Sequence, residues 1–147
     1  MSSSLSRFVR AKIKWLDILS SVLDLAIRLY VAKVFFQSGL TKIASWSSTL
    51  ALFEDEYHVP LLPPVVAAYL GTAVELGIPV LLVLGLGTRF ASVVLFVFNI
   101  VAAISYPDLS DSGLKDHILW GWLLAVLVFH GPGRISLDFL FWRKFGR

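Results

Sequence analysis

The sequence predicts an all-α integral membrane protein, a bundle of four membrane-spanning helices that forms a single domain over residues 1–147. Hydrophobic residues make up 57% of the 147 residues and charged residues only 16%. In soluble domains hydrophobic residues, with glycine included, average about 45–50%, and charged residues average about 25%. A chain this short has too little interior to bury so much apolar surface. Its mean hydropathy of +0.79 therefore indicates that lipid is the solvent for much of that surface.

The first span is expected over residues 18–42. It carries three charged residues, Asp24, Arg28 and Lys33. A basic residue at the centre of a span costs about 2.5–3.5 kcal/mol on the insertion scale, so the apolar residues barely offset this cost. An amphipathic helix on the membrane surface is the alternative for this segment, but the loop charges described below require it to cross.

Three further spans are expected over residues 65–87, 90–106 and 117–133. The only Asp, Glu, Lys or Arg well inside them is Glu75. A bilayer core of about 30 Å needs roughly 17–25 helical residues, and each segment reaches that length. Short interfacial helices are expected as well, over residues 5–17, 46–57 and 135–142.

The charges outside the spans predict the orientation of the chain. Basic residues gather before the first span, between the second and third, and after the fourth, whereas acidic residues gather in the other two loops. The basic set is Arg7, Arg10, Lys12, Lys14, Arg89, Arg134, Arg143, Lys144 and Arg147, and the acidic set is Glu54, Asp55, Glu56, Asp108, Asp111 and Asp116. Because basic loops stay in the cytoplasm, both termini are expected there, in a multi-pass membrane protein. The net charge of +3 then reports topology, and no nucleic-acid partner is expected.

Ionisable residues within the membrane are the main functional signal, because lipid excludes them unless they are paired or functional. Glu75 is expected near the midplane, at the depth of Lys33 and within reach of Arg28, and should pair with one of them. Asp24 and Arg28 are four residues apart and can pair on one helix face. Together with Asn99, the residues Arg28, Lys33 and Glu75 form a predicted polar centre. It would either fix helix packing, conduct protons or bind a polar head group such as that of a quinone.

Aromatic residues near the span ends allow two interpretations. Tyr106, Trp120 and Trp122 could line a slot for a quinone or a lipid, or they could belong to the aromatic belt at the membrane interface.

The histidines predict no metal site and no haem. His117 and His130 lie about 20 Å apart on one helix, and only His58 could meet His117. The hypothesis for His117 is an interfacial anchor and for His130 a helix C-terminal cap. With no cysteine in the chain, disulfides, thiol redox chemistry and cysteine-ligated metal sites are excluded.

Over roughly residues 20–140 the sequence resembles the DoxX family of small bacterial and archaeal membrane proteins. The matching residues are Arg28, Phe36, Gly39 and Lys42 in RLYVAKVFFQSGLTK, then Glu75, Gly85, Thr88, Arg89 and Ala91 in ELGIPVLLVLGLGTRFAS, and last HGPGRISLD at residues 130–138. The resemblance implies a four-helix inner-membrane protein related to the small subunit of a thiosulfate:quinone oxidoreductase. It supplies no catalytic motif to transfer.

The functional expectation is therefore a membrane subunit or partner of an oxidoreductase system near the quinone pool. A non-enzymatic anchor or assembly scaffold for a partner protein is the alternative, and a small-solute carrier built from oligomers is a third. The sequence does not decide whether the protein is an enzyme. Its expected partners are the lipid bilayer and either another protein or further copies of this chain.

Overall fold

The computed structural model describes the backbone of residues 2–145 and the side chains of residues 15–145. This part of the chain is all-helical and contains no strand, which confirms the predicted all-α class. The helices are α1 (Ser2–Ala44), α2 (Trp46–Asp55), α3 (Pro64–Leu84), α4 (Thr88–Ser105), α5 (Asp111–His130) and α6 (Leu137–Phe145).

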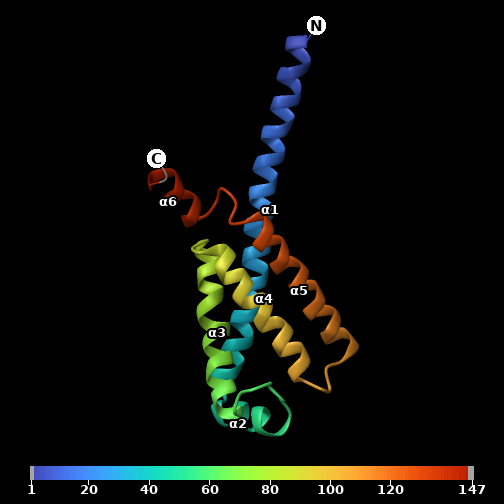
Figure 1. Ribbon diagram of the computed structural model, residues 1–147, viewed down its shortest axis with the longest axis vertical. Helices are drawn as coiled ribbons and strands as arrows, with labels where there is room; N and C mark the ends of the chain where they lie inside the picture. The colour runs from blue at the N-terminus through green and yellow to red at the C-terminus, as the bar shows by residue number, and fades with distance from the viewer. Residues whose placement is uncertain (1, 146–147) are drawn as a thin grey trace.

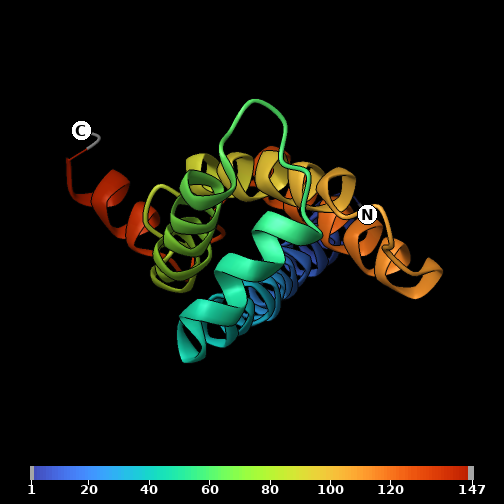
Figure 2. The same ribbon diagram turned by 90° about the horizontal axis from the view of Figure 1, so that it is seen from below.

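Four long helices run side by side along the molecule, with α1 packed mainly on α3 and α4 packed mainly on α5 (Figure 1). The short helix α2 lies across one end of this bundle, as the view from below also shows (Figure 2). The other end carries α6 and both chain termini (Figure 1). The fold therefore has an α2 end and an α6 end, and these names are used below.

The helix α1 is one continuous helix of 43 residues, so the expected separate surface helix over residues 5–17 was wrong. No proline or glycine interrupts the chain between residue 2 and Gly39, and such breaks are what end helices. At 1.5 Å per residue the helix is about 65 Å long, about twice the thickness of a bilayer core. Its first part accordingly extends well beyond the other helices (Figure 1).

The helices α3, α4 and α5 are each long and apolar enough to cross a membrane. Their bounds follow local signals: Pro64 occupies the first turn of α3, and Gly85 ends it in the left-handed conformation, as is common at helix starts and ends. Many large apolar side chains on these helices point outward, among them Val97, Ile104 and Phe129. The protein therefore contacts the lipid bilayer.

The helix α5 begins six residues earlier than the expected span. Its N-cap is Ser110, whose side chain accepts a hydrogen bond from the backbone N–H of Gly113, a strong start signal. Asp111 and Asp116, which were expected in a loop, therefore lie in the first turns of the helix and are exposed. The segments expected as short helices at 46–57 and 135–142 are helical over most of their length, as α2 and α6.

Candidate functional site

The four residues of the predicted polar centre do not come together. Glu75 lies toward the α2 end of the bundle and pairs with Lys42, so the expected pairing with Arg28 or Lys33 was wrong. Arg28 is buried toward the α6 end, and Lys33 is exposed. Asn99 bonds to a histidine on α5. The structure thus contains two separate polar clusters instead of one centre.

The first cluster joins α1 to α3. The Nζ atom of Lys42 lies 2.6 Å from Oε2 and 2.8 Å from Oε1 of Glu75. The hydroxyl of Ser38 donates to Oε1 of Glu75 at 3.0 Å and accepts from Lys42 at 3.0 Å. Both charged side chains are largely buried, with exposed fractions of 15% for Lys42 and 6% for Glu75. Every oxygen of the carboxylate is therefore satisfied by α1.

The register of this pair depends on a close helix contact. A Cβ atom at Gly39 would lie 2.8 Å from Cδ2 of Leu76 and 3.1 Å from Cβ of Glu75. Glycine at this position lets the end of α1 approach α3, and Ser38 and Lys42 on the same face then reach the carboxylate. Lys42 was not expected as the partner of Glu75, because the expected span ended at Lys42 and so placed it in water. The run Ser38-Gly39 with Lys42 one turn later was the available signal.

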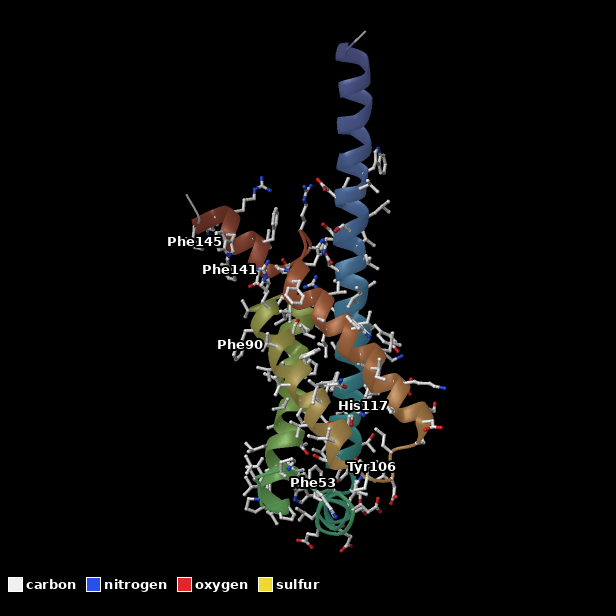
Figure 3. All side chains as sticks on the ribbon, turned by 45° about the vertical axis from the view of Figure 1, so that its right-hand side comes forward. Phe53, Phe90, Tyr106, His117, Phe141 and Phe145 are labelled. Atoms are coloured by element: carbon white, nitrogen blue, oxygen red, sulfur yellow. The ribbon has the colours of Figure 1, made fainter. Side chains whose placement is uncertain are left out.

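A cavity of about 350 Å³ adjoins this cluster. Its lining residues come from α1, α3, α4 and α5, and from α2 with the segment that follows it. Its walls are mainly apolar, as in most small-molecule sites. The polar side chains that line it are Ser38, Lys42, Tyr57, Glu75, Ser105, Tyr106, His117 and Trp120. Figure 3 shows three of the lining residues, Phe53, Tyr106 and His117, toward the α2 end of the bundle.

Two phenols stand in this wall, with ring centroids 5.2 Å apart in Tyr57 and Tyr106. Burial raises the pKa of Tyr57, and the carboxylate of Glu75 raises it further. The carboxylate of Glu56 raises the pKa of Tyr106. Both phenols therefore stay protonated at neutral pH. Tyr57 can donate a hydrogen bond to a ligand, whereas the hydroxyl of Tyr106 donates to the carboxylate of Glu56.

His117 stands in the wall on the α5 side, and Asn99 on α4 holds its ring. Nδ1 of His117 lies 2.8 Å from Oδ1 of Asn99, and Nδ2 of Asn99 donates to the backbone carbonyl of His117 at 2.9 Å. The imidazole packs edge-on against Trp120, with ring centroids 5.0 Å apart. His117 is therefore part of a hydrogen-bonded wall and not the simple interfacial anchor that we expected.

The expected aromatic slot is divided between two cavities. Tyr106 and Trp120 line the first, whereas Trp122 lines a second, almost wholly apolar cavity of about 330 Å³ between α4 and α5. His117 lines both cavities, whereas Asn99 lines only the second. The side chain of Trp122 is 70% exposed and faces the surroundings of the bundle.

Arg28 is the central residue of the second polar cluster. It is fully buried, and its guanidinium donates to the backbone carbonyls of Leu82 and Ile135. The carbonyl of Leu82 belongs to the last turn of α3, where free carbonyls and the helix dipole favour a cation. The expected ion pair between Arg28 and Asp24 is not formed. Arg28 instead ties α1 to the end of α3 and to the segment before α6.

Asp24 pairs with His130, with 2.7 Å between Oδ1 and Nδ1. The Nε2 atom of the same imidazole lies 3.4 Å from Oγ of Ser20. The side chain of His130 therefore joins the end of α5 to α1, and the cap of α5 is the backbone of Gly131. His58 is exposed, and the described residues contain no cluster of three possible metal ligands.

The segment after α5 closes this end of the bundle. The carboxylate of Asp138 accepts hydrogen bonds from the backbone N–H groups of Gly87 and Thr88, at 2.8 and 2.9 Å. The backbone N–H of Asp138 in turn donates to the carbonyl of Gly85 at 2.9 Å. Asp138 thus caps α4 from α6 and holds the turn between α3 and α4.

Apolar helices with outward-facing side chains, two buried charge clusters and a small polar-walled cavity define an all-helical integral membrane protein. The chain belongs to the DoxX family, whose family model matches residues 23–107. It is 32% identical over 130 residues to an uncharacterized protein of Haemophilus influenzae, an alignment that covers 82% of this chain and 84% of that protein. No solved structure gives a significant match.

Proposed function

We propose that this protein binds the head group of a lipid-soluble quinone in the first cavity, as the membrane component of an oxidoreductase system. A partner subunit supplies the electron transfer in this proposal. The observation that carries it is the cavity of about 350 Å³, which combines apolar walls with several donors. A quinone ring is flat and apolar and carries carbonyl oxygens that only accept hydrogen bonds. Tyr57 and the indole N–H of Trp120 are donors of the required kind.

The proposal also assigns the membrane topology. In it, α1 crosses the bilayer together with α3, α4 and α5, both termini are cytoplasmic, and the membrane is the bacterial inner membrane. The location of both termini at the α6 end supports four crossings (Figure 1). The buried hydrogen bonds of Arg28 and the ion pair of Asp24 support crossing by α1, because they satisfy charges that lipid would exclude.

Single cysteines test this topology, because the chain has none of its own. We expect Ser48→Cys on α2 to react with a membrane-impermeant maleimide in intact cells. Arg143→Cys on α6 should react only after the membrane is opened. Both side chains are exposed, so a difference in labelling reports sidedness. Equal labelling of both positions in intact cells would contradict the assignment.

Quinone binding is tested with purified protein in lipid nanodiscs and the tail-less quinone duroquinone. We expect a saturable quenching of tryptophan fluorescence, because Trp120 lines the cavity. The variant Trp120→Phe should lose the saturable part. The matched variant Trp122→Phe should keep it, because Trp122 lines the other cavity.

Quenching that rises linearly with quinone, and equally in both variants, would mean that quinone only partitions into the lipid. That outcome rejects the quinone site and favours the alternative of a membrane anchor or assembly scaffold.

A further inference from the structure

The hydrogen bonds of Asn99 determine which nitrogen of His117 carries the hydrogen. The amide Nδ2 of Asn99 donates to the carbonyl of His117 at 2.9 Å. Turning the amide over would place Oδ1 of Asn99 against the carbonyl oxygen of His117. Because both oxygens only accept hydrogen bonds, the amide must be oriented as described. The Oδ1 atom that faces the ring is then an acceptor, and Nδ1 of His117, 2.8 Å away, must be the donor.

A neutral imidazole with its hydrogen on Nδ1 has an acceptor lone pair on Nε2. His117 lines the first cavity. Its Nε2 atom makes no hydrogen bond within the part of the chain that the structure describes. This nitrogen is not buried, because it is absent from the buried atoms that lack a partner. The Asn99 contact therefore leaves a free and accessible acceptor on an imidazole that lines both cavities.

The neighbouring Trp120 supplies the opposite kind of group. Its indole Nε1–H is buried and has no hydrogen-bond partner, although buried donors are normally paired. Trp120 lines the same cavity as His117, and the two rings are in edge-on contact. Two rings in contact thus carry an unpaired acceptor and an unpaired donor.

We propose that His117 and Trp120 form a subsite for a hydroxyl group of the ligand, held in place by Asn99. A hydroxyl both donates and accepts, so it can donate to Nε2 of His117 and, once a small turn of the indole opens the buried Nε1 to the cavity, accept from Nε1 of Trp120. A quinone carbonyl only accepts and leaves the imidazole unpaired. Resting on the proposed quinone site, this subsite makes the cavity selective for the reduced, hydroxyl-bearing ring. His117 and Trp120 are the residues that determine this specificity, and Asn99 is a positioning residue.

The binding test compares duroquinone with its hydroquinone, without oxygen, on the protein in nanodiscs by calorimetry. We expect the hydroquinone to bind about tenfold more tightly, as one or two added hydrogen bonds allow. The variant His117→Phe should bind both forms alike, whereas Trp122→Phe should keep the preference. Equal affinity of the two forms for the native protein overturns the hydroxyl subsite and leaves the quinone site standing. Binding of neither form rejects both.

The tautomer has its own readout, which needs no ligand. In protein labelled with ¹⁵N-histidine, at about pH 8, which is above the ordinary pKa of imidazole, only three histidines contribute signals. The signals lost in His117→Phe identify this ring, and we expect its Nδ1 to be protonated and its Nε2 unprotonated. Asn99→Leu should move the hydrogen toward Nε2 and reduce the preference for hydroquinone. A hydrogen on Nε2 in the native protein overturns the inference whatever the quinone does.

Discussion

Replacing Lys42 by alanine is expected to destabilise the protein by about 3–5 kcal/mol, the cost of breaking a buried ion pair by removing one partner. The carboxylate of Glu75 loses its two contacts with Nζ and is left largely buried, with 6% of its side chain exposed. Thermal unfolding in a mild detergent measures the loss.

Removing the other partner is expected to cost less. In Glu75→Ala the ammonium of Lys42 can follow its flexible stem toward water at the α2 end of the bundle, whereas the carboxylate has no such route from the middle of α3. The double variant Lys42→Gln with Glu75→Gln should be more stable than Lys42→Ala, because no unpaired charge remains buried.

Lys33→Ala is the matched control for these variants. Lys33 is exposed on the same helix and forms no ion pair in the described part of the chain. We therefore expect almost no change in melting temperature. A loss in Lys33→Ala as large as that in Lys42→Ala would show that the Lys42–Glu75 pair contributes no specific stability.

Gly85→Ala is expected to destabilise the other end of the bundle by about 2–5 kcal/mol. About 1–2 kcal/mol comes from holding a side chain in the left-handed conformation, at φ +66°. A further 1–3 kcal/mol, roughly, comes from overpacking, because the added Cβ would lie 2.6 Å from Cβ and 2.9 Å from Cα of Ser136 and would also meet the guanidinium of Arg28.

Gly87→Ala separates these two contributions. Gly87 has a similar φ of +57°, but no atom lies within 4 Å of an added Cβ. It should therefore lose only the conformational part, about 1–2 kcal/mol. If both alanine variants melt at the same temperature, the close packing of Arg28 and Ser136 around Gly85 contributes nothing measurable.

The sequence singled out Arg28, Lys33 and Glu75 as charges inside the membrane, but Lys33 is exposed and the expected pairing of Glu75 was wrong. Arg28 and Glu75 are both buried, as residues that lipid should exclude are expected to be. Their partners depend on how far α1 slides along α3, and that register follows from the close contact at Gly39. Counting depth from the ends of segments cannot supply this distance. It placed Lys33 opposite Glu75, where the structure has Lys42.

The histidines show the same limit. His117 and His130 were interpreted from their positions on one helix, as an anchor and a cap. Their actual partners, Asn99 and Asp24, come from other helices, 18 and 106 residues away in sequence. No local pattern distinguishes a histidine that bonds within its own helix end from one that reaches a neighbouring helix.

Composition and periodicity by themselves determined that this protein is all-helical and contacts lipid, because so much apolar surface has no other solvent. They also located the helices to within a few residues, except where α1 continues without a break and α5 begins early at its Ser110 cap. Only the tertiary structure decided which charges pair and where the cavity lies. The ion pairs depend on the register between helices, and the cavity depends on side chains from four or five separate elements. A single sequence does not contain the distances between these elements.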